Sequence, residues 1–278
     1  MEKDSPAMVT RAKDSPSFEA FILAGGVSSR MRRAKHLLDF GGVPLILQTA
    51  RLLEPLVRKI TVIGARRNTV PAGIRTIPDD DFGIRSEVNR RNGPLAGIVT
   101  ALSHSHSTWN LILACDMPYL NIRWLAWLLH RAANSHAEVV IPRTRRGLEP
   151  LAAIYHRDCC NAFAQSLMRR VPKVTETLKV LRLEVLKERE WREFDPDGLV
   201  LNNLNTPADY QQAQVWFRDQ GYITIGGKLE RTPPPPIEIT RPSINRPPVL
   251  SLPPAERESK PPLITFCAPL AKRRNKTA

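Results

Sequence analysis

The chain has 278 residues, 42% of them hydrophobic, which is enough to bury one large core or two smaller ones. It contains no apolar run of about 18 residues, and its first 17 residues are polar, which argues against a membrane span and a cleaved secretory signal. We therefore expect a cytoplasmic protein without a membrane partner.

The net charge of +14 would suit a protein that binds nucleic acid. No helix-turn-helix, zinc or aromatic-stacking signature accompanies it, so we expect no specific nucleic acid partner. Ten Lys and Arg against four Glu lie from Tyr222 onward, and the rest of the excess belongs to the body of the chain. A positive field in the body suits an enzyme that handles phosphorylated substrates.

The four cysteines have neither Cys-x-x-Cys spacing nor His partners at zinc-finger distances. We interpret the adjacent Cys159 and Cys160 as packing residues in a reduced compartment rather than a redox pair, and Cys115 as a small buried hydrophobe. The cysteines are Cys115, Cys159, Cys160 and Cys267.

Short apolar runs alternate with helical patterns through the first two thirds of the chain. The runs predicted as strands are 20–24, 60–63, 74–77, 111–114, 138–141, 151–155, 181–186 and 200–201. The patterns predicted as helices are 45–56, 94–102, 124–133, 160–167 and 207–217, and residues 82–92 are polar and basic and predict a loop. This alternation predicts an α/β fold with a doubly wound, mostly parallel, Rossmann-like sheet covered on both faces.

The two ends of the chain differ from its middle. Residues 1–17 have little apolar content and predict a disordered arm, and residues 18–220 form the predicted domain. Twelve of the 25 prolines lie between Pro233 and Pro269. Proline at that density opposes helices and sheet ladders, so residues 221–278 are predicted to be an extended, basic, disordered tail.

The first predicted strand ends directly in Gly25-Gly26 and a basic loop that contains Arg30 and Lys35. Glycines after a strand let backbone N–H groups approach an anion, so the loop fits a phosphate cradle. It matches neither the P-loop nor the dinucleotide-binding pattern, and it also fits a Gly-Gly turn with a solvated basic loop.

Two acidic positions also follow predicted strands. Asp79 begins a run of three aspartates, and Asp116 precedes Met117 and Pro118. Ligands bind such sheets beyond the carboxyl ends of the strands, so these groups and the glycine loop are expected to converge on one crevice. Asp116 fits a magnesium ligand and, as an alternative, a cap for the helix that follows.

Five segments in order resemble the molybdenum cofactor guanylyltransferases, members of the nucleotidyltransferase group that includes sugar-phosphate pyrophosphorylases. The first is Leu-Ala-Gly-Gly-x-Ser-Ser-Arg-Met-x-x-x-Lys, at Leu23 to Lys35. The resemblance covers roughly residues 19 to 217. The other segments are Phe40-Gly-Gly-Val-Pro-Leu45, Gly93-Pro-Leu-Ala-Gly97, Leu113-Ala-Cys-Asp-Met-Pro118 and Asn203-Leu-Asn-Thr-Pro-Ala-Asp209.

The resemblance implies transfer of GMP from GTP to the phosphate of molybdopterin, with Mg²⁺ as cofactor and pyrophosphate as the leaving group. It implies that Lys35 and Asp116 are catalytic, that Asp116 holds the metal, and that Asn203 and Asn205 contact the pterin. Recipient molybdoenzymes or their chaperones are the partners it implies. The nucleotide-binding set implied is Leu23, Ala24, Gly25, Gly26, Arg30, Lys35, Asp79 and Asp116.

Leu-Ala-Gly-Gly at Leu23 favours guanine, because related cytidylyltransferases read Leu-Ala-Ala-Gly and Gly25 leaves room for a larger base edge. The chain departs from the family where Arg32 replaces a glycine, Ala34 an acid and Gly64 an asparagine. Alternatives are a cytidylyl- or sugar-phosphate nucleotidyltransferase and a non-catalytic nucleotide-binding relative. Asn203 and Asn205 also fit a turn that caps the helix at Pro207.

Overall fold

The computed structural model describes residues 17–24, 35–40, 42–65, 69–78, 93–171, 173–219, 223–225 and 228–230. The predicted N-terminal arm, the loop at 82–92 and the prolines from Pro233 onward lie outside these ranges. None of the helices within the ranges is long and apolar enough to cross a membrane.

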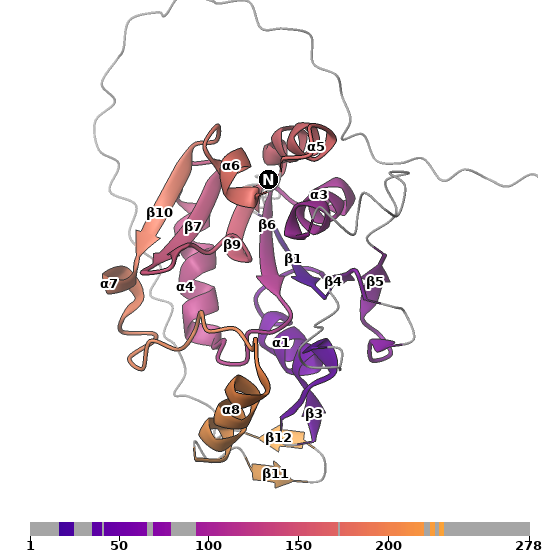
Figure 1. Cartoon of the computed structure of the whole chain (residues 1–278), viewed down its shortest axis with the longest axis vertical. Helices are drawn as coiled ribbons and strands as arrows, with labels where there is room; N and C mark the ends of the chain where they lie inside the picture. Colours follow the sequence, from indigo (N-terminus) through magenta and orange to yellow (C-terminus); the bar gives the residue numbers. More distant parts are fainter. Residues whose placement is uncertain are drawn as a thin grey trace, which may run out of the picture.

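A central sheet runs through the described part of the chain (Figure 1). Its strand order is β10-β7-β9-β6-β1-β4-β5, and the short β8 pairs with β7. The strands are β1 (Phe18–Leu23), β4 (Ile60–Ile63), β5 (Arg75–Ile77), β6 (Trp109–Ala114), β7 (Val139–Thr144), β8 (Gly147–Leu148), β9 (Ala152–His156) and β10 (Leu183–Lys187). β1 pairs in parallel with both β4 and β6, as β4 does with β5 and β10 with β7. The predicted doubly wound, mostly parallel sheet is confirmed.

One long strand opposes this direction, because β9 pairs antiparallel with β6 and β7. Residues 145–151, with β8 among them, join β7 to β9. A parallel return needs a crossover of about a dozen residues or more, so this short connection allows only the antiparallel arrangement.

Helices cover both faces of the sheet, as expected for parallel strands that are apolar on both sides. The helices on the sheet are α1 (Leu45–Leu53), α3 (Pro94–His104), α4 (Ile122–Ala133), α5 (Cys160–Met168), α6 (Val174–Leu178) and α7 (Glu188–Trp191), whereas α8 (Pro207–Asp219) belongs to a separate core. α1 and α4 pack on one face in a cluster that includes Ile22 and Trp124, whereas α3, α5 and α6 pack on the other with Phe21 and Phe163. Successive β1 side chains therefore serve opposite cores.

A third, smaller core joins α8 to the β2–β3 hairpin, which consists of β2 (Asp39–Phe40) and β3 (Val43–Pro44). The Phe40 ring contacts the rings of Tyr210 and Phe217 at centroid distances of 5.2 and 5.0 Å. The Tyr210 hydroxyl donates to the Asp39 carbonyl over 2.6 Å. The last predicted helix, α8, therefore packs against this hairpin. The hairpin follows Lys35 closely in the sequence and was not predicted.

Two segments have a different secondary structure from the one predicted. The strand expected at Val200–Leu201 is wrong, because both residues lie in turns and the Asp195 carboxylate accepts the Leu199 and Val200 amides over 2.8 and 3.2 Å. Both side chains are buried in the α4-side core, which explains their apolar character. After Gly221, where no ladder was expected, β11 (Ile223–Ile225) pairs with β12 (Lys228–Glu230) ahead of the first proline of the tail.

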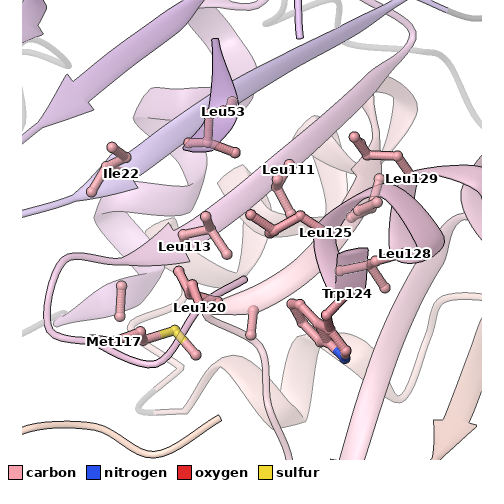
Figure 2. Packing of buried hydrophobic residues seen from close by; sticks show 14 of the residues in the cluster. Ile22, Leu53, Leu111, Leu113, Met117, Leu120, Trp124, Leu125, Leu128 and Leu129 are labelled. Atoms are coloured by element: carbon pink, nitrogen blue, oxygen red, sulfur yellow. The ribbon is translucent and has the colours of Figure 1, made fainter. Parts of the chain in front are cut away.

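Replacing Leu125, which is fully buried on α4, tests the core that supports β6 (Figure 2). Leu125→Ala is expected to lower the free energy of unfolding by about 2 to 5 kcal/mol, because the packing around it cannot fully close the cavity. The matched control is Val180→Ala, where 76% of the residue is exposed and the change should be within about 0.5 kcal/mol. Urea denaturation measures both, and equal effects would contradict this core assignment.

Cys159 is fully buried, and its thiol donates to the Glu138 carbonyl over 3.2 Å. Burial first, and then the Glu138 and Asp158 carboxylates, raise its pKa to about 12. Thiolate is the reactive form, so iodoacetamide at pH 8 should modify Cys159 only after unfolding. The raised pKa also makes stability fall as the pH rises from about 9 towards 12. Mass spectrometry of labelled peptides checks this, and rapid native labelling of Cys159 would refute it.

Candidate functional site

The carboxyl ends of β1 and β6 lie side by side at the centre of the sheet, where Leu23 pairs with Ala114. From β1 the chain winds outward through β4 and β5, then crosses to β6 on the other side. Such a reversal of strand order marks the crevice in which open α/β sheets bind ligands. Leu23, Ala24 and Asp116, three of the predicted site residues, lie at this point.

Backbone hydrogen bonds fix the last two residues before the glycine loop. The Ala24 amide donates to the Ile63 carbonyl over 2.8 Å, and the Cys115 amide donates to the Leu23 carbonyl over 3.1 Å. These hydrogen bonds hold the carboxyl ends of β1, β4 and β6 together. Gly25, Gly26, Arg30 and Asp79 lie outside the described residues, as do the departures at Arg32 and Ala34.

Lys35 begins a short 3-10 helix, η1 (Lys35–Leu37), that packs against α1. The next residue, His36, is buried, and its Nε2 lies 3.1 Å from the Thr69 hydroxyl. Burial lowers the pKa of His36, so the ring stays neutral near pH 7 and stability is lost as the pH falls below the ordinary His range. His36 therefore anchors the backbone at Lys35, a role that its sequence position did not suggest.

Asp116 follows β6 and is buried, with 9% of its surface exposed. Met117 and Leu120, in the same loop, pack into the α4-side core together with Leu113 and Trp124 (Figure 2). The alternative role of Asp116 as a helix cap is wrong, because Asn121 caps α4 by accepting the Trp124 amide over 2.9 Å.

The Asn203–Asn205 segment lies directly beside Asp116, because the Leu204 amide donates to the Asp116 carbonyl over 2.9 Å. The Oδ1 atom of Asn203 is buried and has no hydrogen-bond partner among the described residues. This oxygen is therefore available to accept a hydrogen bond or to coordinate a cation.

The Asp116 carboxylate and the Asn203 side-chain oxygen are donors of the kind that a hard cation such as magnesium prefers. Magnesium takes one or two protein carboxylates and completes its shell with phosphate oxygens and water. Within the described ranges no group of three or more His, Cys, Asp or Glu residues could hold a metal.

The backbone conformation or the close packing at three positions near the candidate site explains why each is a glycine. Gly64 adopts φ +82°, a conformation that glycine tolerates readily. Gly93 adopts φ +51° just before α3. A Cβ at Gly97 would lie 3.0 Å from Leu23 Cδ1, so this glycine lets α3 press against the end of β1.

The turn before α8 is closed by a reciprocal cap. The Asp209 carboxylate accepts the Asn205 and Thr206 amides, each over 2.8 Å, and the Thr206 hydroxyl accepts the Asp209 amide over 3.1 Å. The capping thus comes from Thr206 and Asp209, the Thr-x-x-acid signature of a capping box.

Three comparisons bear on what the site does. A family model described as the MobA-like NTP transferase domain matches residues 20–181. The molybdenum cofactor guanylyltransferase of Syntrophotalea carbinolica is 32% identical over 202 residues, which span 73% of this chain and 91% of that protein. A probable molybdenum cofactor guanylyltransferase of Pelotomaculum thermopropionicum is 30% identical over 195 residues, or 70% and 90% of the two chains.

The fold is similar to the crystal structure of the molybdopterin-guanine dinucleotide biosynthesis protein A of Archaeoglobus fulgidus. The TM-score is 0.62 at 21% sequence identity, and the match covers 72% of this chain and 99% of that one. At this identity the likeness supports the fold.

Removing the cap at α8 tests how the Asn203–Asn205 segment is held. Asp209→Ala is expected to lower the free energy of unfolding by about 1 kcal/mol and to speed hydrogen exchange at the Asn205 and Thr206 amides. Asp219→Ala, at the exposed far end of the same helix, is the matched control and should change neither quantity. Equal exchange in the two variants would show that the cap does not order the segment.

Proposed function

This chain belongs to the MobA-like NTP transferase family, and we propose that it transfers GMP from GTP to the phosphate of molybdopterin. In this reaction an oxygen of the molybdopterin phosphate bonds to the α-phosphorus of GTP. The bond from that phosphorus to the oxygen bridging to the β-phosphate breaks, and pyrophosphate leaves. The product is the guanine dinucleotide form of the cofactor.

The observation that carries the proposal is the hydrogen bond from the Leu204 amide to the Asp116 carbonyl. It brings the Asn203–Asn205 segment to the backbone of Asp116, which follows β6 at the point where strand order reverses. A transferase with two anionic substrates needs one place where a triphosphate and an acceptor phosphate can meet in line. The carboxyl edge between β1 and β6 supplies such a place.

The nucleotide half of the proposed site is built on β1. The backbone of Leu23, Ala24, Gly25 and Gly26 would approach GTP, as two glycines allow at the end of a strand. Arg30 and Lys35 would neutralise the phosphates, and Asp79 would contribute to nucleotide binding. Gly25 would leave room for the larger edge of guanine.

Asp116 would hold the Mg²⁺ ion, with Asn203 Oδ1 as a further oxygen ligand or as a contact to the pterin together with Asn205. The bound ion would neutralise charge on the phosphate oxygens. Asp116 and Lys35 would then both stabilise the charge that develops as pyrophosphate leaves. The proposed setting is the cytoplasm, where a recipient molybdoenzyme or its chaperone would take the product.

Two alternative functions are compatible with the same fold but predict different assay results. A cytidylyl- or sugar-phosphate nucleotidyltransferase would prefer another nucleotide or acceptor, and the relatives named above do not favour it. A non-catalytic relative would bind nucleotide without turnover, as a consequence of Arg32 and Ala34 in the signature loop.

Pyrophosphate release from GTP with Mg²⁺, with and without molybdopterin, tests the proposal. Asp116→Asn and Lys35→Ala are each expected to lower kcat by about a hundredfold or more, because each removes charge stabilisation from the transition state. Asp158→Asn is the control, since this carboxylate is 73% exposed and lies just beyond β9 at the opposite edge of the sheet.

Release that requires molybdopterin and prefers GTP supports the guanylyltransferase. A preference for CTP would reject it in favour of the first alternative. Absence of release with any nucleotide, in protein with a normal unfolding transition, would favour the non-catalytic relative.

A further inference from the structure

Tyr119 lies three residues after Asp116 and packs differently from its neighbours in the same loop. Met117 and Leu120, which flank it, are buried in the α4-side core. Tyr119 is half-buried and packs instead against the third core, which joins α8 to the β2–β3 hairpin. The loop that carries Asp116 is therefore held by two cores, and Tyr119 supplies its contact with the smaller one.

The contact of Tyr119 with α8 is a specific ring pair. Its ring meets the Trp216 ring edge to face, with centroids 5.1 Å apart and planes at 87°, a geometry that aromatic pairs favour. Burial, and then the Asp209 carboxylate, raise the pKa of the Tyr119 hydroxyl. Tyr119 is thus a neutral phenol near pH 7, and phenylalanine can make the same ring contact.

The ring contacts continue from Trp216 to the far side of α8. Trp216 meets Phe217 at a centroid distance of 5.2 Å, and Phe217 meets Phe40 of β2 at 5.0 Å. We call these four residues the aromatic chain: Tyr119, Trp216, Phe217 and Phe40. The aromatic chain runs from the Asp116 loop across α8 to the hairpin that follows Lys35.

The Lys35 end of the aromatic chain is also tightly held. Phe40 lies only five residues after Lys35. Leu38, between them, is buried in the same core, and its carbonyl accepts the Leu45 amide over 2.8 Å. The Gln48 side-chain amide donates to the Phe40 carbonyl over 2.9 Å. A displacement of Phe40 would therefore be transmitted to the backbone near Lys35.

We propose that Tyr119 is a positioning residue and that the aromatic chain fixes the spacing between the Asp116 loop and the backbone at Lys35. The inference rests on the proposed function, in which these two residues act on one triphosphate. A misplacement of about 1 Å in such a site can cost about a hundredfold in rate. A rigid connection between groups from distant parts of the chain therefore favours catalysis.

Steady-state kinetics of Tyr119→Ala and Tyr119→Phe test the positioning role. Tyr119→Ala should lower kcat about tenfold or more with little change in KM for GTP, because the charged groups are misplaced but not removed. Tyr119→Phe keeps the ring and should stay within about twofold of the wild type. An equal loss in both variants would overturn the inference, since the hydroxyl and not the ring would then matter.

The matched control is His156→Ala. It removes a ring that meets Trp109 edge to face at 5.0 Å and 82°, at the amino end of β6. This contact has the same geometry as the Tyr119–Trp216 pair but lies at the opposite edge of the sheet, so kcat should be unchanged. Thermal unfolding of every variant checks that the fold persists.

Hydrogen exchange of the free protein provides a readout that does not depend on activity. Tyr119→Ala should speed exchange about tenfold at the Leu204 amide, which donates to the Asp116 carbonyl, and at the Leu45 amide, which donates to the Leu38 carbonyl. The Ala20 amide, which donates to the Lys59 carbonyl at the amino edge, is the reference for global opening and should be unchanged. His156→Ala should leave the Leu204 and Leu45 amides unchanged.

Faster exchange at both Leu204 and Leu45, with Ala20 unchanged, supports the inference. Unchanged exchange at Leu45 would overturn it, because the two ends would not be coupled, and so would an equal rise at Ala20, which would show a general loss of stability. If the wild type transfers no nucleotide, the proposed function fails separately. The exchange experiment then still decides whether the aromatic chain couples the two segments.

Discussion

The backbone hydrogen bond between Leu204 and Asp116 is the contact on which the arrangement of the site depends. It joins the end of the central strand to the segment before the last helix, two parts of the chain that are far apart in sequence. Because the Thr206–Asp209 cap and the aromatic packing of α8 hold that segment, the position of Asn203 is set by the small third core. A side chain beside the proposed metal thus depends on packing some distance away.

The two proposed catalytic residues, Asp116 and Lys35, each lie next to buried residues in the chain. Asp116 stands between β6, which pairs on both sides, and the buried side chains of Met117 and Leu120. Lys35 stands between the signature loop and the buried His36. Both residues therefore have supported backbones, which suits groups that act on a transition state without reorganising.

The proposed reaction uses the two sides of the strand reversal for two substrates. β1 and its loop would hold the nucleotide, and the Asn203–Asn205 segment beside the Asp116 backbone would serve the acceptor. Such separation of substrates lets the affinity for one change without the other.

Local periodicity determined most of the fold. The strands β1, β4 and β6 and the helices α1, α3, α4, α5 and α8 were predictable because their apolar residues recur at the spacing of a strand or a helix, and the position of Asp116 was predictable because it follows such a strand. The short helices α6 and α7 were not predicted. Other features depended on contacts that local patterns do not encode. The antiparallel β9 follows from a short connection, and Val200 and Leu201 are buried in turns because Asp195 holds their backbone. The contact of the Leu204 amide with the Asp116 carbonyl forms only when distant segments of the chain pack, so the tertiary structure alone decided it.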